Sequence, residues 1–322
     1  AMIARLVGSE MCIRDRHVFI VPSDGGSARQ LTFGEFNHYG SLAWAPDSQK
    51  IFFSAHRSEN WELVSDEADI YSVDIITKDL KQISDEVGAE RSPSISPNGK
   101  MIAYSFEERR PLAYSPNQVA IMDINGNNKR IISKNLDGDA DNLQWSDDNR
   151  SIFFSYDERG IRKIGQLMLN GEIKNITNDL GGTTLGRPYL SGSYHHSAKN
   201  IAFTYGGGNR PADVAVLMNG KVNVLTELNN DLLDQLKLGD INELVYNSSF
   251  DDQEIQGWYI TPPDFDPKKK YPLILEIHGG PHLAYGPYFS AELQIMAASG
   301  YVVFYNNYRG SLSYGEDFAL LL

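Results

Sequence analysis

A segment of about 50 residues recurs four times between residues 40 and 226. In the first three copies a turn rich in Pro, Asp or Asn precedes a run of β-prone residues, as in APDSQKIFFSA and SPNGKMIAYSF. Repeats of about 40–50 residues built from short strands are typical of β-propeller blades. The copies align without gaps, at intervals of 51, 50 and 49 residues, on Ile51, Ile102, Ile152 and Ile201.

One copy of the repeat predicts four strands, which in the first complete copy cover 42–45, 50–56, 69–76 and 80–83. A single four-stranded sheet exposes both faces, and copies that pack face to face around an axis cover them. The alternative is a β-sandwich whose spacing is coincidental. A second series of registered strand endings, such as Ile83-Ser84 and Ile132-Ser133, favours the propeller.

The number of copies predicts an incomplete β-propeller over residues 17–238. Residues 17–32 supply only the outer two strands of a further blade, so four blades plus a half-blade are expected. The stretch 9–16 resembles a translated adapter sequence, so residues 1–16, which contain the single cysteine Cys12, are interpreted as a non-native leader outside the fold. One cysteine cannot form an intramolecular disulfide. The four blades are expected at 40–84, 91–133, 141–177 and 187–226.

Residues 239–322 show a different pattern, in which strands and helices alternate. ELVYNSSF and EIQGWYITP predict a hairpin, and the apolar run at 273–277 predicts a strand buried on both faces. A helix is expected at 290–298, with Gly300 as its C-terminal stop, followed by the strand in YVVFYNNYRG. This order predicts the N-terminal part of an α/β domain, cut off within a last helix, so the chain is interpreted as a fragment.

Two motifs in this second region are specific. EIHGGP, then a helix, then NYRGSLSYG at the end of the next strand resembles the prolyl oligopeptidase (S9) family of serine peptidases. The resemblance extends over residues 17–322 and is strongest for the acylaminoacyl-peptidase and dipeptidyl-peptidase-5-like branch. It implies an α/β-hydrolase domain after a β-propeller, short peptides as substrates, cleavage through an acyl-enzyme, and no cofactor.

The resemblance also implies roles for individual residues. HGGP falls where the family places its oxyanion-hole loop, so His278, Gly279 and Gly280 are the candidates, with Gly279 as the main backbone donor. His278 is expected to orient this loop. The second motif predicts a structural active-site loop held by Asn307, Arg309 and Tyr314, in which Arg309 makes an ion pair.

The catalytic triad of such an enzyme is absent from these 322 residues. An α/β-hydrolase nucleophile lies in G-x-S-x-G, and the nearest sequence, at 310–315, has one residue too many between its glycines. Ser311 and Ser313 are therefore interpreted as loop residues, and the chain alone is expected to be inactive. A non-catalytic propeller that binds a partner and an α/β-hydrolase esterase are the alternatives.

Charge and hydropathy bear on whether the chain binds nucleic acid or a membrane. The net charge of −13, from 29 basic and 42 acidic residues, disfavours binding to nucleic acid or to an anionic membrane. No apolar run is long enough for a membrane helix. Compartment and oligomeric state are not indicated, and both a cytoplasmic and a bacterial periplasmic location stay open.

Three further groups of residues are interpreted as structural, and no metal site is expected. Asp137, Asp139 and Asp141 alternate like calcium ligands but lack the glycine and glutamate of a calcium loop. His195-His196 have no further ligand at a suitable spacing. Some dipeptidyl members of the family use paired glutamates to hold a substrate's amino terminus, but Glu107-Glu108 precede two arginines and are expected to form rim salt bridges.

Overall fold

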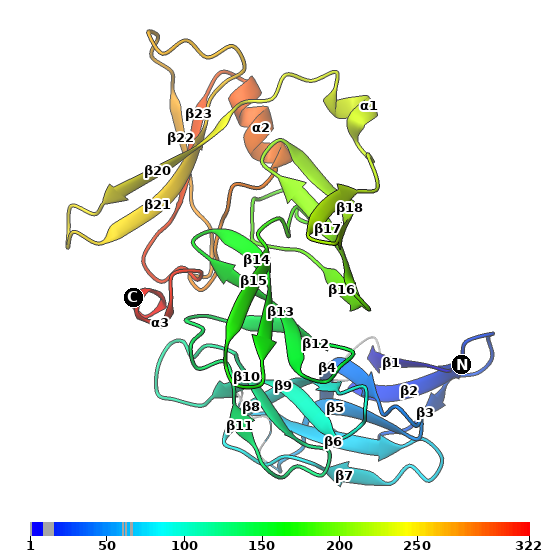
Figure 1. The fold of residues 1–322 in the computed structure, drawn as a ribbon. Helices are drawn as coiled ribbons and strands as arrows, with labels where there is room; N and C mark the ends of the chain where they lie inside the picture. The colour runs from blue at the N-terminus through cyan, green and yellow to red at the C-terminus, as the bar shows by residue number, and fades with distance from the viewer. Residues whose placement is uncertain (1, 9–15, 60, 62, 65–66) are drawn as a thin grey trace. The chain divides into compact units, whose positions relative to one another are not determined.

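The structure is a computed structural model of the chain, and it describes all residues except 1, 9–15, 60, 62, 65 and 66. Cys12 lies outside the described residues. The described residues are mostly β and form two compact units (Figure 1). The first unit is Ala1–Phe154 with Gln166–Ile173, and the second is Ser155–Gly165 with Lys174–Leu322. The two units are groups of residues that contact one another more than they contact the rest of the chain. The division into two domains after residue 238, which the sequence suggests, stays a prediction.

The first sheet has seven strands in the order β1-β2-β4-β5-β6-β7, with β3 paired to β2. It therefore joins the expected half-blade to the first blade. Strands β2 and β4 are connected through one parallel residue pair, Arg16↔Asn37. Beside this pair, His38 Nδ1 lies 2.5 Å from the Arg16 carbonyl oxygen. The strands are β1 (Met2–Gly8), β2 (Arg16–Pro22), β3 (Arg29–Gln30), β4 (Asn37–Trp44), β5 (Lys50–His56), β6 (Asp69–Asp74) and β7 (Leu80–Gln82).

Two expectations for the N-terminal residues need correction. The sequence predicts that residues 1–16 lie outside the fold, but β1 pairs antiparallel with β2 along its whole length. The half-blade was expected to be separate from the first blade, but β2 adjoins β4. A strand edge exposes unpaired N–H and C=O groups, and pairing with a neighbouring strand satisfies them. The origin of residues 1–16 stays a prediction.

The next two repeats form four-stranded sheets at the expected positions. Strand β5 shows how such sheets stack, because alternate side chains enter different cores. Ile51 and Phe53 pack with Tyr71 and Val73 of the same sheet, whereas Phe52 packs with residues of the following sheet. The strands are β8 (Gly88–Ile95), β9 (Met101–Glu108), β10 (Gln118–Asp123), β11 (Arg130–Ile131), β12 (Ala140–Trp145), β13 (Ser151–Glu158), β14 (Ile161–Met168) and β15 (Ile173–Thr177).

The fourth repeat forms the sheet β16 (Tyr194–Ser197), β17 (Asn200–Gly207), β18 (Arg210–Met218) and β19 (Lys221–Val224). The repeat is visible in the backbone as well as in the sequence. The residue three positions before each shared isoleucine has a positive φ, at 59°, 70°, 62° and 54° for Ser48, Gly99, Asn149 and Ala198. The same tight turn therefore joins the first two strands of each copy. These four-stranded antiparallel sheets are consistent with propeller blades.

The C-terminal sheet has the order β20-β21-β23-β22. Strands β22 and β23 are parallel, while β21 is antiparallel to both β20 and β23. The expected helix forms as α2 (Ala291–Ala298), capped by the Ser290 side chain, and Gly300 follows it at φ +92°. The other elements are α1 (Asn230–Leu233), β20 (Ile241–Asn247), β21 (Glu254–Ile260), β22 (Leu273–Glu276), β23 (Val302–Asn307) and α3 (Glu316–Ala319).

The expectation that the run at 273–277 is buried on both faces is wrong. Leu273, Leu275 and Ile277 are 63%, 54% and 60% exposed. Strand β22 lies at the sheet edge, and α2 packs on one face, where Leu293 joins the core. On the other face, Leu275 and Ile277 line an open groove of about 310 Å³.

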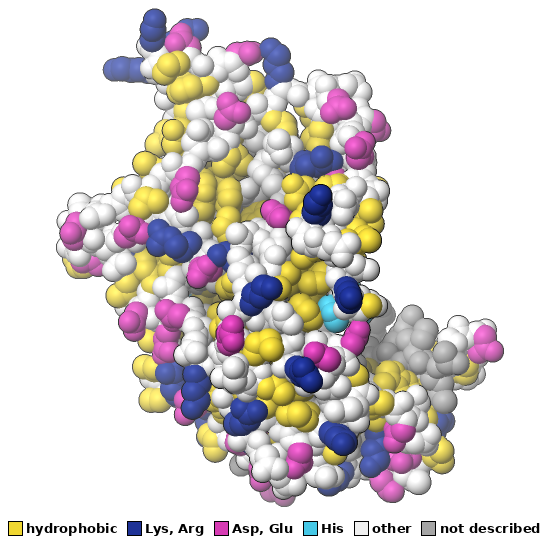
Figure 2. Space-filling view, in the orientation of Figure 1, with side chains coloured by type: hydrophobic (Ala, Val, Ile, Leu, Met, Phe, Trp, Pro, Cys, Tyr) yellow, Lys and Arg dark blue, Asp and Glu magenta, His cyan; other side chains and the backbone are white. Residues whose placement is uncertain are grey.

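The surface carries mixed charge. On the face shown in Figure 2, Lys and Arg side chains are interspersed with Asp and Glu side chains over most of the area. Within the described residues, none of the helices has the length and apolarity that crossing a bilayer requires.

Candidate functional site

The loop that follows β22 is fixed at its first residues by aromatic packing. His278 is 2% exposed, and its ring stacks on Tyr308 with centroids 4.5 Å apart. The edge of Tyr285 meets the same imidazole at 5.0 Å. The Tyr308 hydroxyl also donates to the His278 carbonyl oxygen at 2.6 Å. Tyr308 follows β23, so the loop after β22 is held by the end of its parallel neighbour.

The protonation state of His278 follows from its partners. Nδ1 lies 2.8 Å from the Gly279 carbonyl oxygen, which can only accept, so Nδ1 carries a proton. Burial lowers the pKa of His278, which keeps the ring neutral at pH 7. Nε2 then accepts from the Ser311 hydroxyl at 3.0 Å. Ser311 is fully buried, so its hydroxyl is not an exposed nucleophile. The hydrogen bond instead links the loop after β22 to the loop after β23.

Gly279 and Gly280 differ from the rest of the loop because they are exposed. A Cβ at Gly279 would meet no atom within 4 Å, whereas Gly280 has φ +128° and a Cβ there would lie 2.8 Å from the His282 nitrogen. No acceptor among the described residues takes either N–H group. The loop therefore presents two unused backbone donors at the carboxyl end of a parallel strand, a common position for ligand sites in such sheets.

Asn307 clamps the far end of this loop. It is the last residue of β23, and its side chain is fully buried. Its Oδ1 accepts the Tyr285 N–H at 2.8 Å, and its Nδ2 donates to the Tyr285 carbonyl at 2.8 Å and to the Tyr314 hydroxyl at 2.9 Å. Tyr314 in turn donates to Gln256 Oε1 at 2.6 Å. The motif indicated Asn307 and Tyr314, but nothing in the sequence pointed to Tyr285 or Gln256 as their partners.

Arg309 makes the ion pair that the sequence suggested. Its guanidinium pairs with Asp251 through two nitrogens, and one of them also donates to Ser248 Oγ at 2.7 Å. Hydrogen bonding to Arg309 lowers the pKa of Asp251. Both acceptors lie in the turn between β20 and β21, so Arg309 ties the loop after β23 to that hairpin.

Ser313 has a role that the sequence did not reveal. Its carbonyl oxygen accepts the Arg159 N–H at 2.7 Å, and its hydroxyl oxygen accepts the Gly160 N–H at 2.8 Å. Ser313 adopts φ +82°. A Cβ at Gly160 would lie 2.5 Å from the Trp258 ring, so this turn between β13 and β14 also needs glycine for a close approach.

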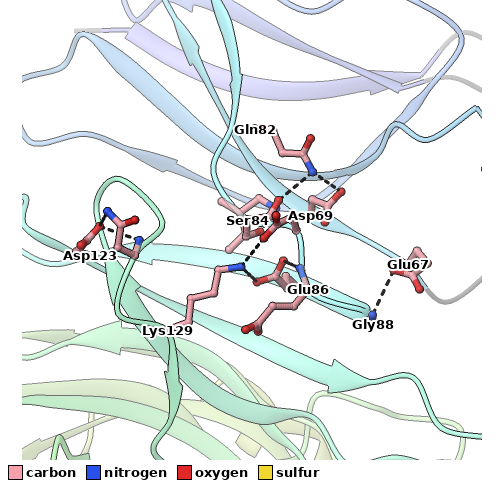
Figure 3. A network of polar contacts seen from close by, with 12 residues as sticks. Glu67, Asp69, Gln82, Ser84, Glu86, Gly88, Asp123 and Lys129 are labelled. Atoms are coloured by element: carbon pink, nitrogen blue, oxygen red, sulfur yellow. Dashed lines mark hydrogen bonds and ion pairs between the residues drawn. The ribbon is translucent and has the colours of Figure 1, made fainter.

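A second polar cluster lies in the first unit (Figure 3). Gln82 Nε2 donates to Asp69 at 3.0 Å, and Lys129 Nζ is 3.0 Å from Asp85. Glu90 is fully buried, and its Oε1 makes no hydrogen bond and lies 4.0 Å from Lys129 Nζ. Burial raises the pKa of Glu90 to about 7. Burial, with Glu67 and Asp85 nearby, raises that of Asp69 to about 6.

The paired glutamates form salt bridges, as expected. Glu107 accepts from Arg91 at 2.8 Å, and Glu108 lies 4.0 Å from Arg110. Arg109 pairs with Glu67 at 2.7 Å.

Another candidate group is the run of alternating aspartates at 137–141. Asp139 accepts the Asn117 N–H at 2.7 Å. Within the described part of the chain, no group of three or more His, Cys, Asp or Glu residues could hold a metal ion.

Comparison with known proteins identifies the family. The sequence profile of the dipeptidyl peptidase IV N-terminal region matches residues 14–111, and that of the prolyl oligopeptidase family matches residues 287–321. The chain belongs to the prolyl oligopeptidase family. Dipeptidyl-peptidase 5 of Porphyromonas gingivalis is 26% identical over 285 residues, and that of Aspergillus fumigatus is 30% identical over 240 residues. These alignments cover 85% and 71% of this chain but only 40% and 32% of the relatives.

Solved structures of other proteins share the fold of this chain. Acylaminoacyl peptidase of Pyrococcus horikoshii matches with a TM-score of 0.64 at 18% identity, covering 99% of this chain and 57% of that one. A puromycin-hydrolyzing peptidase of Mycobacterium tuberculosis matches with a TM-score of 0.64 at 15% identity, covering 98% and 59%. The chain thus spans less than two thirds of the length of each of these four proteins.

Proposed function

We propose that this chain is the incomplete propeller and the N-terminal hydrolase part of a serine peptidase that cleaves short peptides through an acyl-enzyme. The observation that carries the proposal is the loop after β22. It offers the unused N–H groups of Gly279 and Gly280 at an exposed site, while Tyr308 and Asn307 hold both of its ends. Membership of the prolyl oligopeptidase family supports the peptidase chemistry.

The proposed chemistry assigns this loop to the substrate oxygen. When a serine hydroxyl attacks a peptide carbonyl, negative charge develops on the oxygen, and preorganised N–H donors stabilise it. Gly279 and Gly280 are the donors on this chain. The serine, the acid and the histidine base would follow in an enzyme of this type, and residues 1–322 contain no G-x-S-x-G sequence. Residues 1–322 by themselves should therefore hydrolyse no peptide.

The source DNA gives the first test. We expect the reading frame to continue past the codon for Leu322 and to encode G-x-S-x-G, then an Asp and a His. The protein encoded by that complete frame should react with a fluorophosphonate, which labels activated serines, and should release p-nitroaniline from dipeptidyl or acylaminoacyl anilides. Residues 1–322, expressed alone, are the matched control and should do neither.

Two outcomes would overturn the proposal. Activity on p-nitrophenyl esters without activity on any anilide would make the protein an esterase. A reading frame without a nucleophile motif would leave a non-catalytic binding protein.

A further inference from the structure

We infer that Arg187 is a positioning residue for the oxyanion loop and acts through Glu276; this inference rests on the proposed function. Arg187 lies between β15 and β16, about 90 residues before the loop in sequence. Its Nε donates to Glu276 Oε1 at 2.6 Å. Glu276 ends β22 and precedes His278 by two residues. The Arg187 and Glu276 side chains are 32% and 16% exposed, so this ion pair is more shielded than a typical surface pair.

The same carboxylate oxygen holds the other end of the loop. The Tyr285 hydroxyl donates to Glu276 Oε1 at 3.1 Å. Burial, and then the neighbouring Tyr189 and Glu276, raise the pKa of Tyr285, so its hydroxyl keeps its proton and stays a donor. The Glu276 side chain thus links the end of β22 to Tyr285, and Gly279 and Gly280 lie in the segment between these two residues. Arg187 compensates the negative charge of the Glu276 carboxylate, which accepts the hydrogen bond from Tyr285.

Arg187 is itself held in place by the chain around it. The Leu185 carbonyl accepts the Ala291 N–H at 2.8 Å, and the Gly186 carbonyl accepts the Ser290 hydroxyl at 2.7 Å. The Pro188 carbonyl accepts the Gly286 N–H at 2.9 Å. The guanidinium therefore projects from a fixed backbone. A second ion pair joins Arg187 to Glu292 in the first turn of α2.

Loss of Arg187 should affect catalysis more than substrate binding. The oxyanion donors contribute mainly in the transition state, and small displacements of such groups are costly. Arg187→Met in the protein encoded by the complete reading frame should lower kcat by about 10- to 100-fold while KM changes little. Arg187→Lys keeps the charge and one donor and should recover part of the loss.

The matched control is Arg159→Met. Arg159 also pairs with a carboxylate of the C-terminal sheet, Glu254, at 2.6 Å, but that residue starts β21, and within the described part of the chain its side chain makes no hydrogen bond to residues 276–285. This pair is about half exposed, at 55% and 51%, so kcat should stay within about twofold of the unsubstituted enzyme. An equal loss of kcat in both variants, or a rise in KM alone, would overturn the inference.

A double-mutant cycle tests the route through Glu276. In a Glu276→Gln background, Arg187→Met should cause little further loss, because the charge that Arg187 compensates is gone. In a Glu292→Gln background it should keep its full effect. Additive effects of Arg187→Met and Glu276→Gln would contradict the inference.

Hydrogen exchange separates this inference from the proposed function. In residues 1–322, Arg187→Met should speed amide exchange over 278–285, and Arg159→Met should not. If the complete protein proves inactive but exchange still distinguishes the variants, the proposed function fails and the positioning by Arg187 stands. If the protein is active and exchange over 278–285 is unchanged, the positioning claim fails alone.

Discussion

The buried polar clusters around Asn307 and around Glu90 differ in how far their hydrogen bonds are satisfied. Around Asn307 every polar atom of the buried amide has a partner, and the whole group is neutral. Around Glu90 a fully buried carboxyl has one oxygen without a hydrogen bond, and the nearest ammonium lies 4.0 Å away. The first arrangement fixes a loop independently of pH. The second makes the stability of its unit depend on pH, because a buried charge without a close partner is costly.

The largest effect is expected for Asn307→Ala, which removes the amide from the satisfied cluster. The Tyr285 N–H and carbonyl and the Tyr314 hydroxyl would each lose a partner in a buried site. At about 1–3 kcal/mol for each unsatisfied group, the second unit should lose about 3 kcal/mol or more. Denaturant-dependent hydrogen exchange of the β23 amides measures this loss.

The neighbouring residue supplies the control for that change. Asn306 donates to the Tyr246 hydroxyl at 2.8 Å from a half-buried site, so Asn306→Ala should cost about 1 kcal/mol. Equal losses for the two alanine variants would show that the Asn307 cluster is no stronger than a single hydrogen bond.

The pH dependence tests the unsatisfied cluster. The pKa of Glu90 rises from 4.5 to about 7 on folding, so its contribution to stability is full below about pH 4.5 and is lost as the pH rises through 7. Glu90→Gln removes the charged form and should stabilise the first unit by roughly 2–3 kcal/mol at pH 8, with the gain shrinking toward pH 5. Hydrogen exchange of the β9 amides at several pH values measures this gain.

Glu108→Gln is the control, because Glu108 lies in the same unit with a side chain that is 65% exposed. It should change stability little at any pH. A pH-independent gain for Glu90→Gln, or the same gain for both variants, would contradict the burial argument.

Sequence could predict those features that depend on local pattern. The repeat fixed the strand positions because Ile51 and its counterparts must enter a core, and the turn before each of them needs a positive φ. The motifs indicated Asn307 and Arg309 as loop residues, and the ion pair of Arg309 is present. Both inferences rest on residues that are close together in sequence.

The features that sequence missed depend on distant partners. Ser313 accepts hydrogen bonds from a turn more than 150 residues earlier, and no pattern links the two segments. The exposure of Leu275 depends on which strand lies at the sheet edge, and an apolar run alone does not specify that. The pairing of β1 with β2 likewise depends on backbone edges, which any side chains can offer.

The smallest effect is expected for Tyr314→Phe, which tests whether the Asn307 cluster acts as one network. The Tyr314 hydroxyl accepts from Asn307 at 2.9 Å and donates to Gln256 at 2.6 Å, and Phe would leave Gln256 Oε1 and one Asn307 N–H without this partner. Both bonds of Asn307 to Tyr285 remain, so the cost should be about 1–2 kcal/mol, below that of Asn307→Ala. Tyr246→Phe, which removes a hydroxyl from a half-buried site, is the control. The double variant Asn307→Ala/Tyr314→Phe should have a lower free energy of unfolding than Tyr314→Phe alone. If the two free energies are equal, the hydroxyl rather than the amide holds the loop, and the contrast between the two clusters loses its basis.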